Sequence, residues 1–200
     1  MIGSILIAIV LLGGAFLGYF RLLPTFLLEN DWSMWALYLL LFAVGISVGS
    51  DKELSSKLRN QNPVLLLVPL ITIVGTLIGV LLITPFVTGR SVAECLAVGS
   101  GFGYYSLSSI LITGYKGTDL GVVALMSNII REVTVLVFTP FLVRYFGKLA
   151  PICCAGATSM DSTLPVIIKS TGSEYVIIAL IHGILVDFSV PFLVGFFCTI

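Results

Sequence analysis

Charged residues and histidine are scarce in this chain of 200 residues. Only 10% of the residues are charged, acidic and basic side chains are equal in number, and histidine occurs once, at His182. Because no basic stripe runs along the chain, nucleic acid has no electrostatic surface to bind. A single histidine leaves little room for metal centres or catalytic triads, and the common hydrolase, zinc-protease and nucleotide-binding motifs are absent. The sequence therefore predicts neither an enzyme nor a metal site, and it excludes ATP-driven transport by this chain alone.

Cysteine is also rare, and its placement argues against a disulfide framework. The four cysteines lie within apolar segments, where the side chain usually serves as a small buried hydrophobe. Hydrophobic residues make up 58% of the chain and the mean hydropathy is +1.15, a composition typical of a protein that crosses the bilayer several times. We expect an all-α, polytopic helical membrane protein with about six to seven membrane segments.

Apolar runs long enough to cross a bilayer as helices divide the chain. The first run lacks the basic start and the cleavage site of a signal peptide, so we expect it to remain as a span. Lys52, Lys57 and Arg59 follow the second run, which predicts a cytoplasmic loop there. Residues 1–200 are expected to form a single transmembrane transporter domain. Its predicted spans lie near residues 2–20, 32–49, 64–87, 119–145 and 174–200.

Two further apolar segments, near residues 91–113 and 150–170, are interrupted by glycine, proline and hydroxyl residues. Such interruptions indicate discontinuous or re-entrant helices, which are tolerated at membrane depth only where they line protein or a wet cavity. If every segment crosses, the basic residues outside the central span divide five to four between the two sides. If the glycine-rich segment re-enters and Lys169 stays inside, they divide six to three, which fits the positive-inside rule better. The sequence leaves both topologies open.

The predicted span near 119–145 carries Asn128, Arg131 and Glu132 at its centre. Asn128 and Glu132 are four residues apart and share a helix face, with Arg131 beside them. Because ionisable groups in hydrocarbon are costly, this patch is a candidate substrate- or ion-binding site. Glu132 would bind an ammonium group or a proton, and Arg131 would hold a substrate carboxylate or anchor Glu132. A purely structural ion pair is the alternative.

Both interruptions contribute further candidates for substrate or ion binding. In the second interruption Asp161 would offer a carboxylate to a cation, whereas Asp161 or Ser159 would alternatively cap a short helix that follows. In the first interruption the serines would contact substrate or bond to their own helix. The candidates in the second interruption are Ser159, Asp161, Ser162 and Thr163. Those in the first are Ser106, Ser108 and Ser109.

The last predicted span contains His182 and Asp187, which suggest a proton relay. They are five residues apart and share a helix face poorly, so a hydrogen bond from His182 to a neighbouring backbone is the alternative. Elsewhere, Glu94 follows Arg90 by four residues near the edge of a span, and we expect an interfacial ion pair between them.

Three stretches together resemble the LysO family of lysine exporters: GSGFGYYSLSSILIT from Gly99, SNIIREV from Ser127 and GATSMDSTLP from Gly156. The resemblance extends from the second span to the last. It implies a secondary transporter of a bacterial cytoplasmic membrane that exports L-lysine and toxic lysine analogues, as an antiporter driven by an inward proton or sodium gradient. Glu132 matches the acidic membrane residue thought to be needed for export in that family. A bound sodium ion is the only cofactor this implies.

The chain departs from the family pattern in length. The usual member is longer, with additional amino-terminal spans that carry another functional acidic residue. The resemblance therefore implies a second small membrane subunit as partner, and a homodimer is the alternative. A channel subunit or a non-transporting scaffold is the other functional class, although a pore predicts a polar stripe along several spans and the polar residues here gather at a few points.

Overall fold

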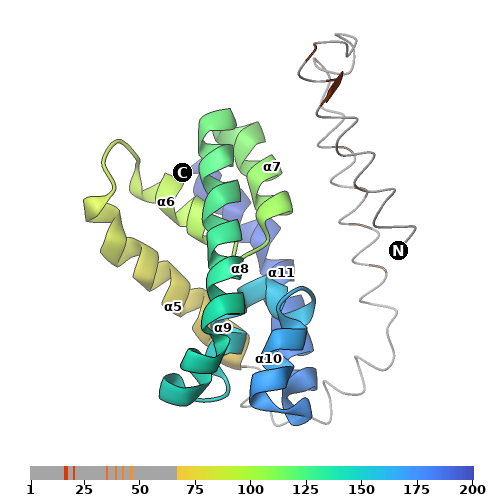
Figure 1. The fold of residues 1–200 in the computed structure, drawn as a ribbon. Helices are drawn as coiled ribbons and strands as arrows, with labels where there is room; N and C mark the ends of the chain where they lie inside the picture. Colours follow the sequence, from red (N-terminus) through yellow and green to blue (C-terminus); the bar gives the residue numbers. More distant parts are fainter. Residues whose placement is uncertain are drawn as a thin grey trace. The chain divides into compact units, whose positions relative to one another are not determined.

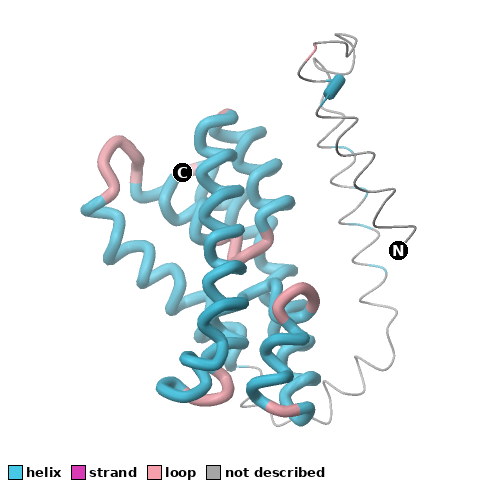
Figure 2. Tube along the Cα trace, viewed as in Figure 1, coloured by secondary structure: helices cyan, strands magenta, loops and turns pink. Residues whose placement is uncertain are grey.

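The computed structural model describes residues 67–200 continuously. Within this range every regular element is a helix, which confirms the expected all-α fold (Figures 1 and 2). The predicted spans near 2–20 and 32–49 and the cytoplasmic loop after them lie outside the continuously described residues. In that earlier part the structure describes only Phe16, Leu17, Phe20, Trp35, Leu39, Phe42 and Ile46.

Three helical stretches within residues 67–200 are long and apolar enough to cross a membrane. Large hydrophobic side chains are exposed along all of them, as expected for helices that face lipid. They lie at the positions of the predicted spans near 64–87, 119–145 and 174–200. The stretches are α5 (Leu67–Ile83) with the 3-10 turn η2 (Thr84–Phe86), α8 (Thr118–Phe146), and the turn η4 (Ser173–Tyr175) with α11 (Val176–Thr199).

The glycine-rich segment folds as two short helices, α6 (Val92–Gly99) and α7 (Tyr105–Lys116). Residues 100–104 between them are not helical. Phe102 and Gly103 have φ angles of 45° and 93°, in the left-handed region that reverses the direction of the chain. The helix therefore breaks where the sequence places its cluster of glycines.

A capping box starts α6. The Ser91 hydroxyl accepts a hydrogen bond of 3.1 Å from the Glu94 N–H, and the Glu94 carboxylate accepts one of 2.9 Å from the Ser91 N–H. The expected ion pair between Arg90 and Glu94 is wrong, because within residues 67–200 the structure forms no such pair. Arg90 precedes the first helical residue, so the i,i+4 spacing does not bring the two side chains together.

The α6–α7 segment enters and returns at the same end of α8. Gly117 alone joins α7 to α8, and Thr113 lies so close to Gly121 that a Cβ added to the glycine would collide with the hydroxyl. The break at Gly103 lies beside Asn128, near the middle of α8. In Figure 1 the loop before α6 and the end of α7 both lie toward the start of α8. In a membrane that α5 and α8 cross, this geometry agrees with the re-entrant alternative.

The second interrupted segment has the corresponding arrangement at the other end of α8. Val135 of α8 lies in one buried cluster with Ile152 and Ile167 from the two arms of the segment. Lys148, just after α8, and Glu174, just before α11, form an ion pair of 3.1 Å, so the segment also begins and ends on one side. Its elements are α9 (Ala150–Ala155), the 3-10 turn η3 (Gly156–Met160) and α10 (Leu164–Thr171).

The basic residues outside the centre of α8 within residues 67–200 divide between the two ends of α8. Arg144 and Lys169, in the last turns of α8 and α10, and Lys148, just after α8, lie on the side where α8 finishes. Arg90 and Lys116 lie on the side where α8 starts. This division matches the described part of the six-to-three distribution, which the positive-inside rule favours.

Candidate functional site

The two interrupted segments meet at their breaks. The N–H of Ala157 in η3 donates a hydrogen bond of 2.9 Å to the carbonyl oxygen of Phe102 in the first break. Gly156 has a φ of 66°, and a Cβ added there would collide with the same carbonyl group. A Cβ added to Gly103 would lie 3.0 Å from the carbonyl oxygen of Ala155. Glycine therefore permits a close approach of two backbones, which satisfies groups that each helix break leaves unpaired.

Asn128 holds the first break against α8. Its side chain is buried, and its Oδ1 accepts a hydrogen bond of 2.7 Å from the N–H of Gly103. Its Nδ2 donates to the carbonyl oxygen of Ala124 at 2.8 Å and to the Ser108 hydroxyl at 3.4 Å. Gly101 lies so close that an added Cβ would collide with the Asn128 amide. The amide is thus fully engaged in fixing the backbone of the break.

Arg131 holds the second break in a similar way. Its Nε donates a hydrogen bond of 2.8 Å to the carbonyl oxygen of Cys154, and its Nη2 donates one of 3.3 Å to that of Cys153. These carbonyls lie at the end of α9, where a helix carries partial negative charge. The guanidinium also lies 5.9 Å from the centre of the Phe102 ring, within cation–π range. Arg131 therefore contacts both breaks.

Glu132 is the remaining member of the predicted polar patch on α8. It is half-buried, at the edge of the buried stripe that runs along α8 through Asn128 and Val135. Within residues 67–200 its carboxylate forms no ion pair with Arg131 and has no hydrogen-bond partner. The three neighbouring polar residues thus have separate environments: two engage the breaks, and the third has a carboxylate without a partner in the described part of the chain.

A pocket of about 230 Å³ opens where the breaks meet α11. Its size lies below the range of roughly 300–1,000 Å³ that is usual for drug-sized ligands, so it suits a small solute. Of the predicted site residues it brings together Ser106, Asp161, Ser162 and Asp187. The rest of its lining is Gly103, Tyr104, Tyr105, Ala157, Thr158 and Met160.

The pocket is acidic. Asp161 and Asp187 both line it, no basic side chain of residues 67–200 does, and the two carboxylates lie within electrostatic range of each other. Oδ1 of Asp161 accepts hydrogen bonds from the N–H and the hydroxyl of Ser162. The N-cap of α10 is Thr163, with no side-chain capping bond, so Asp161 does not serve as the cap. The Asp161 carboxylate therefore lines the pocket without capping α10, and besides the two bonds from Ser162 it can accept from a cation.

The other two serines of the first interruption bond to their own helix. The Ser108 hydroxyl donates to the carbonyl oxygen of Tyr104 at 2.8 Å, and the Ser109 hydroxyl donates to that of Ser106 at 3.2 Å. Such bonds within a helix are the alternative role expected for membrane serines. Ser108 and Ser109 do not line the acidic pocket, whereas Ser106 does.

Ser159, Thr163 and His182 lie buried beside the pocket and outside its lining. The Thr163 hydroxyl donates to the carbonyl oxygen of Thr158 at 2.9 Å. His182 contacts Ser159 at 3.0 Å, and within the described residues no hydrogen bond joins it to Asp187. The structure therefore separates the two residues of the suggested proton relay.

Sequence reasoning missed the aromatic and hydroxyl wall of the pocket. Tyr104 and Tyr105 stand directly after the glycine cluster, and Thr158 stands within the second interruption. Their position at the breaks was the available signal, because irregular backbone at membrane depth must line protein or a cavity.

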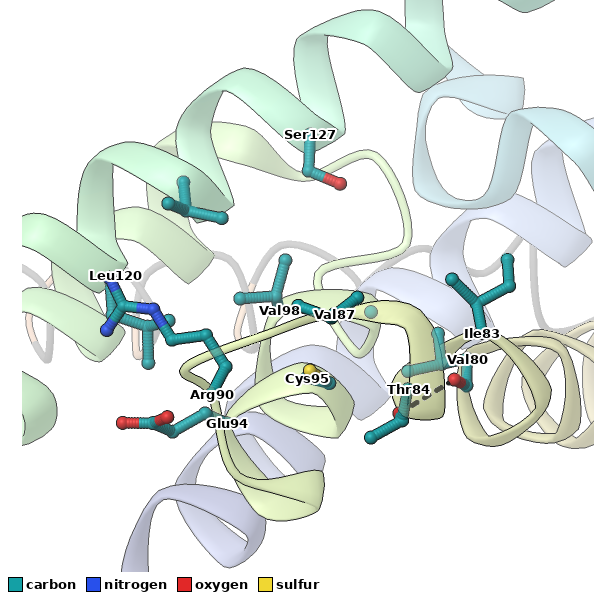
Figure 3. A pocket seen from close by; sticks show the side chains of 12 residues that line it. Val80, Ile83, Thr84, Val87, Arg90, Glu94, Cys95, Val98, Leu120 and Ser127 are labelled. Atoms are coloured by element: carbon teal, nitrogen blue, oxygen red, sulfur yellow. Dashed lines mark hydrogen bonds between the residues drawn. The ribbon is translucent and has the colours of Figure 1, made fainter.

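A second pocket, of about 270 Å³, lies between α5, α6 and α8 (Figure 3). Its walls are mostly aliphatic, with Val80, Val98 and Leu120 among the side chains that project into it. Arg90 and Glu94 both line this pocket without forming an ion pair, and their opposite charges leave its lining without net charge. An apolar lining without net charge offers little to a polar solute. The smaller, acidic pocket is therefore the candidate functional site.

The described helices, with two opposed interrupted segments around one acidic pocket, define a polytopic helical membrane protein. The family model described as lysine exporter LysO matches residues 8–198. The chain therefore belongs to the LysO lysine exporter family.

Two relatives carry names that agree with the family. Lysine exporter LysO of Escherichia coli (strain K12) is 37% identical over 166 residues, which are 82% of this chain and 54% of that protein. A putative lysine exporter of Haemophilus influenzae is 34% identical over 169 residues, which are 84% of this chain and 85% of that protein. The chain thus spans about half the length of the E. coli relative. No solved structure matches the chain.

Proposed function

We propose that this chain exports L-lysine and cationic lysine analogues across a bacterial cytoplasmic membrane. The observation that carries the proposal is the acidic pocket at the junction of the two breaks, in a chain of the lysine exporter family. A cavity lined by Asp161 and Asp187, and by no basic side chain among the described residues, favours a cation over a neutral or anionic solute. The names of the E. coli and H. influenzae relatives support lysine as that cation.

The pocket offers complementary groups to both ends of a zwitterionic lysine. The side-chain ammonium has three N–H donors, which the carboxylates of Asp161 and Asp187 and the hydroxyls of Ser106 and Ser162 would accept. Helix α7 begins at Tyr105 on the pocket wall. Its amino-terminal end carries partial positive charge and would face the substrate carboxylate.

Export against a gradient requires coupling, and we assign it to an inward flow of protons or sodium ions. The same pocket carboxylates would hold the ammonium of lysine in one step and a proton or sodium ion in the next. Glu132 is a further candidate for this exchange, because it is half-buried and has no ion-pair or hydrogen-bond partner within residues 67–200. Its assignment rests on the match to the acidic residue of the family.

A second small membrane subunit, or a second copy of the chain, stays a prediction. Nothing within residues 67–200 supports either arrangement. The shorter match to the E. coli relative, 54% of its length, is the reason to test for a partner.

The experiment that tests the proposed function is uptake of labelled lysine into inverted membrane vesicles. Vesicles with the chain should accumulate lysine when protons or sodium ions are more concentrated in the lumen, which corresponds to the outside of the cell. Excess unlabelled lysine analogue should compete with labelled lysine, whereas glutamate should not. Matched vesicles without the chain are the control. Uptake no greater than the control, with the chain present in the membrane, would show that it does not export lysine without a partner, and co-expression with candidate partners would follow. Equal competition by glutamate would contradict cation selectivity.

A further inference from the structure

A buried chain of hydrogen bonds around His182 links three elements. Nε2 of His182 lies 2.9 Å from the hydroxyl of Thr72 on α5, and Nδ1 lies 3.0 Å from the hydroxyl of Ser159 on η3. The Ser159 hydroxyl in turn lies 2.9 Å from the carbonyl oxygen of Ala179, one turn before His182 on α11. His182, Ser159 and Thr72 are exposed by 1%, 0% and 5%, so water does not compete for these bonds.

The direction of each bond follows from counting protons. The Ala179 carbonyl accepts only, so the single hydroxyl proton of Ser159 is directed to it. The Ser159 oxygen must then accept from His182, which places a proton on Nδ1. With Nδ1 protonated in a neutral ring, Nε2 is an acceptor and the Thr72 hydroxyl donates to it. The arrangement therefore selects one tautomer, the neutral Nδ1–H form.

These bonds fix η3 on α11 directly beside the acidic pocket. At Gly183, the residue after His182, an added Cβ would lie 2.6 Å from the Cβ of Met160, so the two elements are in close contact. Asp161 is the residue after Met160, and Asp187 lies one turn after Gly183 on α11. Both carboxylates line the pocket. The contact between Ser159 and His182 thus joins η3, which leads directly to Asp161, to α11, which carries Asp187.

We infer that His182 is a positioning residue, held as the neutral Nδ1–H tautomer, whose bond to Ser159 sets the geometry of the Asp161 and Asp187 pair. The effect of His182 on lysine binding rests on the proposed function. The tautomer of His182 and its contact with Ser159 do not depend on that function. Thr72 orients the ring from α5, and Ser159 carries the effect to η3.

The tautomer can be measured directly, because the chain contains one histidine. Protein labelled with 15N-histidine, purified through a tag without histidine, gives ring signals from His182 alone. Two-bond 15N–1H correlations at neutral pH should show a protonated Nδ1 and an unprotonated Nε2. Ser159→Ala removes the acceptor and should raise the population of the Nε2–H form. A wild-type ring in the Nε2–H form, or one averaging between tautomers, would overturn the assignment.

Two substitutions of His182 separate its contacts. Asparagine places an amide nitrogen at the bond distance of Nδ1 and keeps a donor to Ser159. Glutamine places its amide group at the distance of Nε2, where the amide oxygen can accept from the Thr72 hydroxyl, and it lacks the donor to Ser159. If the Ser159 contact matters, His182→Gln and Ser159→Ala should each raise the KM for lysine about tenfold, the equivalent of one lost hydrogen bond, with a smaller effect on the maximal rate. His182→Asn should raise it less than His182→Gln.

Ser170→Ala is the matched control and should leave the KM unchanged, because within residues 67–200 that hydroxyl bonds only to its own helix, at 3.2 Å. The reverse order of the asparagine and glutamine variants, or an unchanged KM in Ser159→Ala, would overturn the positioning role. If the histidine variants do not fold, Ser159→Ala and the wild-type spectrum still decide the question. Absence of lysine binding by the wild type would contradict the proposed function and leave the tautomer result intact.

Discussion

The N–H of Ala157 and the carbonyl oxygen of Phe102 share a hydrogen bond of 2.9 Å, and this bond joins two helix breaks that approach from opposite ends of α8. Each break interrupts the helical ladder, and an unpaired backbone group away from water is costly. By meeting, the breaks satisfy part of each other's backbone, and Asn128 and Arg131 satisfy more of it. The acidic pocket lies against this junction, so its shape depends on it.

The junction predicts that Gly156→Ala is strongly destabilising. Alanine at a φ of 66° carries a backbone penalty of roughly 1–2 kcal/mol, and its Cβ would also collide with the Phe102 carbonyl group. Gly147→Ala is the control, because that residue has a φ of 88° but open space around it. The melting temperature in mild detergent should fall clearly further for Gly156→Ala than for Gly147→Ala. Equal melting of the two variants would mean that the collision is relieved cheaply.

Local features of this fold could be predicted from the sequence, because they depend on neighbouring residues. Long apolar runs predicted the helices at α5, α8 and α11, and the glycine cluster predicted the break that contains Phe102 and Gly103. The glycine, proline and hydroxyl residues of the second segment predicted the interruption between α9 and α10. The roles within the polar patch could not be predicted this way. Spacing placed Asn128 and Glu132 on one face. It could not show that the N–H of Gly103, 25 residues away, engages Asn128, while Glu132 has no partner within residues 67–200.

Arg131 illustrates the same limit and leads to a second prediction. Its partners are carbonyl oxygens of Cys153 and Cys154, which no side-chain pattern reveals. Arg131→Met should destabilise the protein, because it removes the donors to both backbone carbonyls. Arg131→Lys should recover part of this loss, because its ammonium group can still donate to one of them. Thermal melting and expression level provide the measurement. Arg144→Gln, at an exposed position of the same helix, should change little. A fully stable Arg131→Met protein would contradict the bracing role.

Glu132 should behave in the opposite way. Because its carboxylate has no hydrogen-bond or ion-pair partner within residues 67–200, Glu132→Gln should fold and melt like the wild type. Glutamine keeps the shape but cannot exchange a proton or balance a cation. We therefore expect lysine export to be lost at normal expression, as measured in inverted vesicles. Near-normal export by a well-expressed Glu132→Gln protein would remove this residue from the mechanism.

The re-entrant geometry predicts which side of the membrane each loop faces. In a background without native cysteines, single cysteines at Arg144 and Lys169 should react with an impermeant maleimide from the same side, and one at Lys116 should react from the other. The reason is that α9–η3–α10 begins and ends at the finish of α8, whereas Lys116 closes the segment at its start. If the cysteines of Lys169→Cys and Lys116→Cys reacted from the same side of the membrane, the second segment would instead cross the membrane.

The pocket carboxylates give the most direct prediction for substrate recognition. Asp161→Asn and Asp187→Asn should each raise the KM for lysine by about tenfold or more, because each removes a charge that balances the ammonium group. Asparagine keeps an Oδ1 that can still accept from the Ser162 N–H and hydroxyl, so the local turn should persist. Helix capping cannot explain an effect of Asp161→Asn, since the cap of α10 lies at Thr163.

The double variant tests whether both carboxylates act on one ammonium group. If they do, combining the substitutions should cost less than the sum of the single effects, since each single variant already loses part of a shared interaction. Asp119→Asn, exposed in the first turn of α8 and outside the pocket, is the matched control and should leave the KM unchanged. Labelled-lysine uptake over a range of concentrations separates KM from maximal rate. An unchanged KM in both single variants, with Asp119→Asn behaving identically, would place the lysine site elsewhere in the protein.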